Sequence, residues 1–99
     1  MIPVDFTIDA KNDLFDAVCY YESKEVGLGV RLRDEILMML DTAAHAPYLW
    51  RERSAGFRRI NCPIFPYYIA YVIRDEVLVV IALAASRRRP GYWSPRLRQ

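Results

Sequence analysis

The chain has 99 residues, of which 54% are hydrophobic and 26% charged, and its formal net charge is +2. This length and composition predict a single globular domain over residues 1–99 and exclude a disordered chain. The opening residues resemble no secretory signal, and the longest apolar run, Val77 to Ala85, is far shorter than the ~20 residues of a membrane-spanning helix. We therefore expect a cytoplasmic protein with no membrane partner.

The charge is divided unevenly along the chain. Residues 1–46 carry nine acidic and four basic residues, a balance of −5, whereas residues 47–99 carry ten arginines and three acidic residues, a balance of +7. Arginine is favoured where bidentate contacts to phosphate or carboxylate are needed. The second half is thus predicted to contact nucleic acid or an acidic protein, the alternative being an arginine-rich composition whose charges are only solvated.

The first predicted element is a short strand over residues 4–8, in which Val4, Phe6 and Ile8 alternate onto one side. Thr7 is a candidate cap for a helix that follows, with Asp9 in its first turn, where negative charge suits the helix dipole. The apolar stripe of this helix has the spacing of one helical face and consists of Leu14, Ala17, Val18 and Tyr21.

A second, longer helix is predicted before Pro47. The stretch "KEVGLG" interrupts the helical pattern with two glycines and indicates a tight connection. The apolar stripe of the second helix consists of Leu32, Ile36, Met39, Leu40 and Ala43. Two helices joined by so short a link form an antiparallel hairpin.

After Pro47 the apolar period changes to two, which predicts strands. Over residues 57–64, Arg58 shares a face with Ile60, Cys62 and Ile64, and Arg59 shares the other face with Asn61. We expect Arg59 to face solvent or a partner. Arg58, if buried, is expected to pair with a carboxylate, for which the acidic first half is one source.

Residues 67–73 and 77–85 are apolar on both faces and are predicted to be inner strands, joined by the short hairpin "RDE" at 74–76. The predicted fold is therefore α+β, with the order β-α-α-β-β-β. It has a mostly antiparallel four-stranded sheet and an α-helical hairpin packed on one face. Because the hairpin covers only one face, we expect an extended partner segment with helix and strand character over the other.

Three stretches of the chain resemble the RelE/ParE superfamily of bacterial type II toxins: "DLFDAVCYYESKEVGLGVRLRDEI", "FPYYIAYVI" and "SRRRPGYW". The resemblance spans Phe6 to Trp93, and the Gly-Leu-Gly link and Pro-Gly-Tyr-Trp ending are more similar to the ParE side. It implies a toxin of a toxin–antitoxin system, of the kind involved in plasmid stabilization, neutralised by a cognate antitoxin that contributes an extended or helical acidic segment. ParE-like members poison DNA gyrase, and RelE-like members cleave messenger RNA on the ribosome.

The residues favour a binding mechanism over cleavage. Ala85 stands where many relatives have a histidine, and the single histidine, His45, lies at a predicted helix end, where a surface cation suits the dipole. A metal-independent endoribonuclease would have to use Arg58, Arg59 and Arg87 for phosphate charge and a tyrosine such as Tyr92 as proton donor. The residue spacing, including that of Cys19 and Cys62, suggests no metal site and no cofactor.

We therefore expect a ParE-like toxin that acts by binding gyrase, and whether it is also an enzyme stays open, a metal-independent endoribonuclease being the enzymatic alternative. The alternatives are a ribosome-dependent mRNA interferase of RelE type and a degenerate, non-toxic member that only binds its antitoxin. The sequence leaves the choice between gyrase and ribosome open.

The predicted binding residues lie mainly in "SRRRPGYWSPR", residues 86–96. Pro90 and Gly91 favour an exit from the sheet near Arg89, after which Tyr92 and Trp93 would fold back and hold the arginines in place. If the aromatic residues instead only seal the core, the arginines are solubilising charges. The residues expected to contact the target or antitoxin are Arg59, Arg87, Arg88, Arg89, Tyr92, Trp93 and Arg96.

Overall fold

The elements follow one another in the predicted order. A computed structural model describes residues 1–98, so Gln99, the last residue of the predicted domain, lies outside the described residues. The elements are β1 (Val4–Phe6), α1 (Ile8–Lys24), α2 (Leu28–His45), β2 (Arg58–Asn61), β3 (Tyr67–Arg74), β4 (Val77–Ala85) and a final 3-10 helix, η1 (Ser94–Arg98). The predicted α+β fold is confirmed. Within the described residues no helix is both long and apolar enough to cross a membrane.

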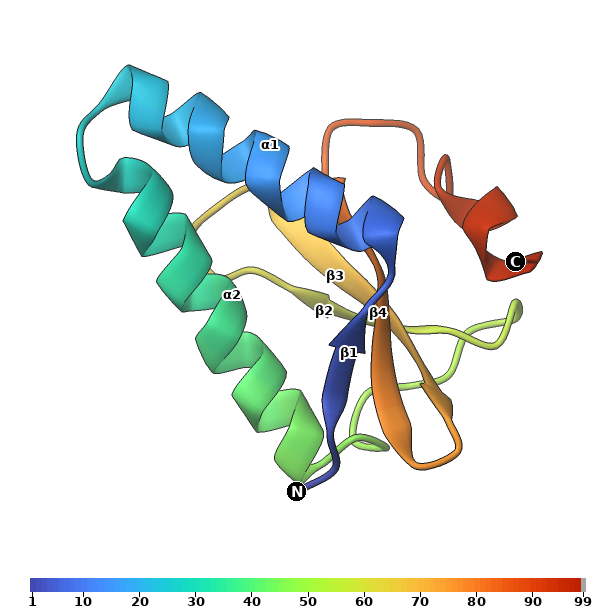
Figure 1. Ribbon diagram of the computed structural model, residues 1–99. Helices are drawn as coiled ribbons and strands as arrows, with labels where there is room; N and C mark the ends of the chain where they lie inside the picture. Colours follow the sequence, from blue (N-terminus) through green and yellow to red (C-terminus); the bar gives the residue numbers. More distant parts are fainter. Residues whose placement is uncertain (99) are drawn as a thin grey trace.

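The four strands form one mixed sheet in the order β1-β4-β3-β2 (Figure 1). The β3 strand pairs antiparallel with β2 and β4, whereas β1 pairs parallel with β4 along the opposite edge. The β3–β4 hairpin turns through Asp75 and Glu76, which take positive φ angles of 51° and 60°. Consecutive positive φ values are typical of the tight turns that match the twist of a two-stranded hairpin.

One side chain fixes the backbone at each end of α1. Thr7 caps α1 by accepting a hydrogen bond from the Ala10 amide at 3.1 Å, as predicted. At the other end, the Glu22 carboxylate accepts hydrogen bonds from the amides of Gly27 (2.7 Å) and Gly29 (2.9 Å) at the start of α2. These bonds satisfy amides that have no partner within the helix. Gly29 has no room for a side chain, because a Cβ there would collide with the Val18 carbonyl oxygen.

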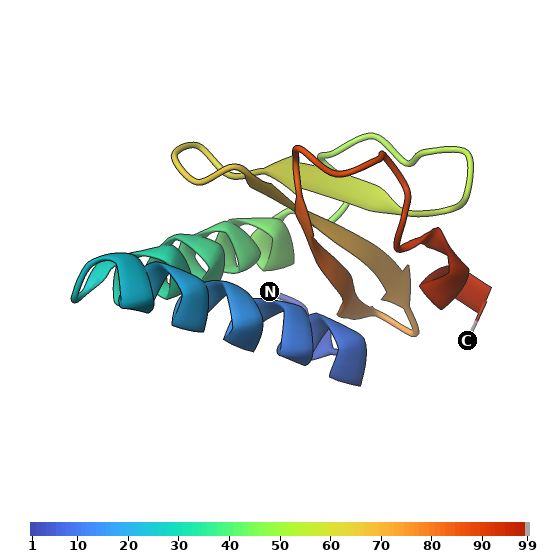
Figure 2. The same ribbon diagram turned by 90° about the horizontal axis from the view of Figure 1, so that it is seen from above.

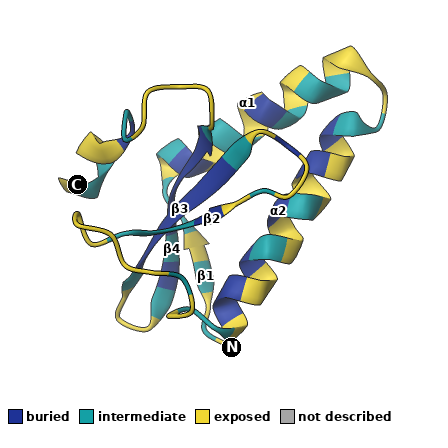
Figure 3. Ribbon diagram, turned by 180° about the vertical axis from the view of Figure 1, so that it is seen from behind, coloured by how far each residue is buried: buried dark blue, intermediate teal, exposed yellow. Residues whose placement is uncertain are grey.

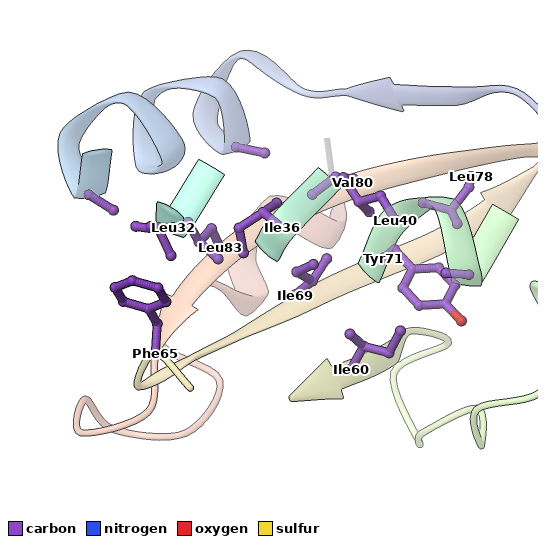
Figure 4. Packing of buried hydrophobic residues seen from close by; sticks show 13 residues of the cluster. Leu32, Ile36, Leu40, Ile60, Phe65, Ile69, Tyr71, Leu78, Val80 and Leu83 are labelled. Carbon is purple, nitrogen blue, oxygen red and sulfur yellow. The ribbon is translucent and has the colours of Figure 1, made fainter. Parts of the chain in front are cut away.

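The larger core lies between the helical hairpin and the sheet. Figure 4 shows Leu32, Ile36 and Leu40 of α2 directed toward side chains of β3 and β4. The predicted stripes of both helices are confirmed, since their residues are buried or packed against this core. The helices lie together on one side of the sheet in the view from above (Figure 2).

The second face of the sheet is covered by the chain itself. Trp93, with 2% of its surface exposed, belongs there to a buried cluster with Tyr68, Ala70 and Ile81, and Phe57, Tyr92 and Leu97 pack against this cluster. Figure 3 shows β3 and β4 as largely buried, while the neighbouring loops are exposed. The expectation that a partner segment must cover this face is therefore wrong, because the C-terminal residues fold over it.

Three local predictions were wrong, each at the end of a strand. Ile8 begins α1 and is 77% exposed, because Thr7 ends the strand by capping the helix. Ile64 is 74% exposed, because β2 ends at Asn61 before the bend at Pro63. The chain leaves the sheet after Ala85 and not near Arg89. The strand β3, which pairs with β4, begins at Tyr67 opposite Ala85, so the pairing of the two strands ends at this position.

Candidate functional site

The C-terminal segment, residues 86–98, is held against the sheet by its aromatic residues. The Trp93 indole Nε1–H donates a hydrogen bond to the Tyr68 hydroxyl at 2.8 Å, and the Phe57 ring meets the Trp93 ring edge to face at 4.7 Å between centroids. A buried indole N–H needs such an acceptor. The prediction that Trp93 folds back is confirmed, and its burial makes the indole a support for this surface.

A charged pair closes the end of the segment. The Arg96 guanidinium donates to both carboxylate oxygens of Asp13 in α1, at 2.6 and 3.2 Å, and to the Ile81 carbonyl oxygen at 3.1 Å. Asp13 also accepts a hydrogen bond from the Leu83 amide at 3.1 Å. Leu83 lies in β4 beyond Val80, the last position of β4 that pairs with β1. The hydrogen bonds to Asp13 raise the pKa of Arg96. Arg96 was predicted to contact a target, and its Nη1 and Nη2 atoms both donate hydrogen bonds within the chain.

Beside this segment lies a cleft of about 500 Å³ on the face opposite the helices. We call it the arginine cleft. It is lined by Arg51, Glu52, Arg53, Ser54, Phe57, Arg59, Tyr68, Pro90, Gly91 and Trp93. The Arg59 guanidinium lies over the Tyr68 ring at 3.8 Å from its centroid and donates to the Asn61 side chain at 3.0 Å. Arg59 thus faces away from the helices, on the side that strand alternation predicted.

Arg58 anchors the loop that carries Arg51 and Arg53. Its Nε donates to the Trp50 carbonyl oxygen at 2.9 Å, and its side chain is only 15% exposed. The Tyr71 hydroxyl donates to the Pro47 carbonyl oxygen at 3.0 Å, which fixes the start of the same loop. The carboxylate paired with Arg58 is that of Glu52, with 3.8 Å between Arg58 Nη1 and Glu52 Oε1. The expected carboxylate partner of Arg58 is therefore present, but it comes from the loop before β2 and not from the acidic first half.

The three consecutive arginines do not form one site. Arg87 lines a different cleft, together with Tyr67 and residues of α1. Arg88 lies over the Tyr92 ring at 3.9 Å from its centroid, and Arg89 lines neither cleft. The cause is the turn after β4, in which the Arg88 amide donates to the Ala85 carbonyl oxygen at 3.1 Å. Residues 87–89 therefore diverge and do not extend as a strand.

The arginine cleft has the chemistry of an anion-binding surface. The imidazole of His45 is not among its lining groups; it lies at the end of α2, where Nδ1 is 2.8 Å from the Asp41 carbonyl oxygen. Burial raises the pKa of Tyr71, whose hydroxyl is already used to hold the loop. Among the described residues, no group of three His, Cys, Asp or Glu side chains is placed to hold a metal ion. The arginines can bind phosphate or carboxylate.

Arg51 and Arg53 were missed by the sequence analysis. Their signal was the short stretch "RERSAGF", residues 51–57, in which two arginines flank one glutamate just before a strand. Without the anchors at Arg58 and Tyr71, nothing in this stretch shows that the loop folds toward the C-terminal segment.

The comparisons with known proteins agree with this architecture. The family described as ParE toxin of type II toxin–antitoxin system, parDE, matches residues 4–90. Among curated proteins none matches the chain. The chain is similar in structure to a chain of the chromosomal ParDE toxin–antitoxin system from P. aeruginosa, with a TM-score of 0.74 and 12% identity over 86% of this chain and 96% of the other.

Two further structures come from E. coli. A chain of the intact RelBE toxin–antitoxin complex has a TM-score of 0.68 and 19% identity, over 89% of this chain and 100% of the other. The isolated RelE toxin has a TM-score of 0.67 and 18% identity, over 99% of this chain and 98% of the other. At these identities the likeness concerns the fold alone.

Proposed function

We propose that this chain, which belongs to the family of ParE toxins of type II toxin–antitoxin systems, inhibits growth by binding DNA gyrase through its arginine cleft. The observation that carries the proposal is the cleft itself. The cleft is surrounded by Arg51, Arg53 and Arg59. The residues that hold its walls in place, Arg58 and Trp93, make their hydrogen bonds within the chain. Arginine is prominent among the residues that dominate binding energy at interfaces, and such a surface needs no acid–base pair.

The proposal includes a cognate antitoxin bound on the other side of the molecule. The C-terminal segment closes the second sheet face, and an open apolar groove of about 400 Å³ lies on the helical hairpin beside β1. Phe15 is 68% exposed there, and Lys11 and Arg33 provide positive charge. The groove suits an amphipathic antitoxin helix with acidic residues at its margin. It is lined by Phe6, Lys11, Leu14, Phe15, Val18, Arg33 and Leu37.

The central experiment separates the two surfaces. In the variant Arg51→Gln with Arg53→Gln, the fold and antitoxin binding should persist, but expression should no longer arrest growth. In Phe15→Ser with Leu37→Ser, expression should still arrest growth, but co-expressed antitoxin should no longer rescue it. Arg74→Gln, at the far end of β3, is the matched control and should behave as the wild type.

Purified protein identifies the target. Gyrase incubated with the wild type should give cleaved or unsupercoiled plasmid, and the Arg51/Arg53 variant should not, while a translation extract stays active. Transcript cleavage on ribosomes with gyrase unaffected would assign the chain to the mRNA interferases. If expression without antitoxin never arrests growth while the antitoxin still binds, the chain is a non-toxic antitoxin-binding member.

A further inference from the structure

A second cleft, which we call the tyrosine cleft, lies at the end of the sheet nearest the tip of the helical hairpin. Its volume is about 300 Å³, and it is lined by Tyr20, Tyr21, Pro66, Tyr67, Ala85 and Arg87. Tyr67 and Ala85 are register partners, and the Ser86 amide donates to the Pro66 carbonyl oxygen at 2.9 Å. The last ladder positions of β3 and β4 therefore fix the floor of the cleft.

Aromatic rings build the walls. The Tyr21 ring meets the rings of Tyr20 and Phe65 edge to face, with centroids 5.1 Å apart in each pair, and that of Tyr67 at 6.1 Å. These contacts pre-order the rings before any ligand binds. A tyrosine phenol is protonated at neutral pH and can donate a hydrogen bond. Burial, followed by the neighbouring Tyr21, raises the pKa of Tyr67 further, to about 12.

The tyrosine cleft carries the positive charge of Arg87, which can bind a ligand. Among the described residues, the Arg87 side chain makes no hydrogen bond, ion pair or cation–π contact, and none of the lining residues is acidic. Lys24 adds a second positive charge close by, with its ammonium 5.0 Å from the Tyr20 centroid. An anion is the complementary ligand.

We propose that the tyrosine cleft binds a nucleotide unit, with its phosphate on Arg87 and its base against the tyrosine rings. The Arg87 guanidinium and the tyrosine phenols together offer more hydrogen-bond donors than the two oxygens of a carboxylate need. A phosphate has three acceptor oxygens and up to two negative charges, and it therefore matches these donors better. Nucleic-acid bases stack readily on exposed aromatic side chains. Ala85 contributes only a methyl group and leaves room for the ligand. This site lies on the helix side of the sheet, apart from the arginine cleft, and does not depend on gyrase being the target.

The test uses the purified full-length chain and NMR of its tyrosine and arginine side chains. Adenosine 5′-monophosphate should shift Tyr21, Tyr67 and Arg87 signals and bind with a Kd of about 1 mM or tighter. Adenosine and inorganic phosphate should each bind at least about tenfold more weakly, because each supplies only half of the contacts. The dinucleotide pTpT distinguishes a strand end from a free nucleotide: tighter binding than the monophosphate assigns the site to nucleic acid, and weaker binding assigns it to free nucleotides.

Variants locate the site. Arg87→Gln should weaken adenosine 5′-monophosphate binding at least about tenfold, and Ala85→Leu should do the same by filling the cleft. Arg74→Gln, an exposed arginine at the opposite end of β3, should bind as the wild type does. The Arg51/Arg53 variant should also retain nucleotide binding, which separates this proposal from the gyrase proposal.

Three outcomes would overturn the proposal. One is equal binding of adenosine and its monophosphate, and another is unchanged binding in both Arg87→Gln and Ala85→Leu. The third is tighter binding of a glutamate-containing peptide than of the nucleotide, which would make the cleft a carboxylate site for a protein partner.

Discussion

The two faces of the sheet are covered in different ways. On one face, α1 and α2 bury a continuous set of aliphatic side chains, so the cover is regular and distributed over many residues. On the other face, the C-terminal segment covers a smaller cluster through one large residue, Trp93, and one charged pair, Arg96 with Asp13. The second cover is therefore concentrated in a few contacts, and the arginine cleft is built beside it.

The largest effect is expected at Trp93. Trp93→Ala should lower the free energy of unfolding by ~3–5 kcal/mol, because an indole that is 2% exposed leaves a cavity that the neighbouring residues cannot fill. Urea denaturation measures this loss. Trp93→Phe keeps a ring but loses the hydrogen bond to Tyr68, and should cost less than the alanine variant. A loss below about 1 kcal/mol for Trp93→Ala would mean that the segment is not part of the cooperative fold.

The charged pair should contribute less than the indole. Arg96→Met should lower the free energy of unfolding by about 2 kcal/mol, since charge-assisted hydrogen bonds to the largely buried Asp13 are lost. Amide exchange should accelerate in residues 86–98 and stay slow in β3. The matched control is Arg33→Met, whose pair with Asp34 is more than half exposed and should cost under ~0.5 kcal/mol. Equal losses in the two variants would contradict this account.

The loop before β2 depends on one hydroxyl. Tyr71→Phe removes the hydrogen bond to the Pro47 carbonyl oxygen and should cost about 1 kcal/mol in urea denaturation. The ring remains packed, so the core should be unchanged. The loop that carries Arg51 and Arg53 should become more susceptible to trypsin. Unchanged trypsin cleavage would show that Arg58 alone holds the loop.

The smallest effect concerns the link of the helical hairpin and appears only in acid. The backbone amide of Gly27 lowers the pKa of Glu22 below its ordinary value of 4.5, so the ionised carboxylate stabilises the folded state. This contribution is present above pH 4.5 and is lost as the pH falls through the lower pKa of the folded protein. The melting temperature of Glu22→Gln should therefore fall less on acidification than that of the wild type. Parallel curves would refute the assignment.

Local pattern determined most of the fold. The helical stripes, the tight link before α2 and the β3–β4 hairpin were predictable because each depends on residues within a few positions of one another. The resemblance to the toxin superfamily followed from the same stretches. Strand ends were less predictable, because the end of a ladder depends on where its partner begins, as Ala85 opposite Tyr67 shows.

The composition of the site was decided by tertiary structure. Strand alternation predicted that Arg59 faces away from the helices, and the sequence indicated that Trp93 would fold back. Neither pattern showed that Tyr68 would contact both side chains. The turn after β4 separates Arg87 from the arginine cleft. Asp13 and Arg96 are 83 positions apart in the chain, and no periodicity connects them. Such contacts depend on where loops carry distant side chains, and a pattern within a single element holds no information about that.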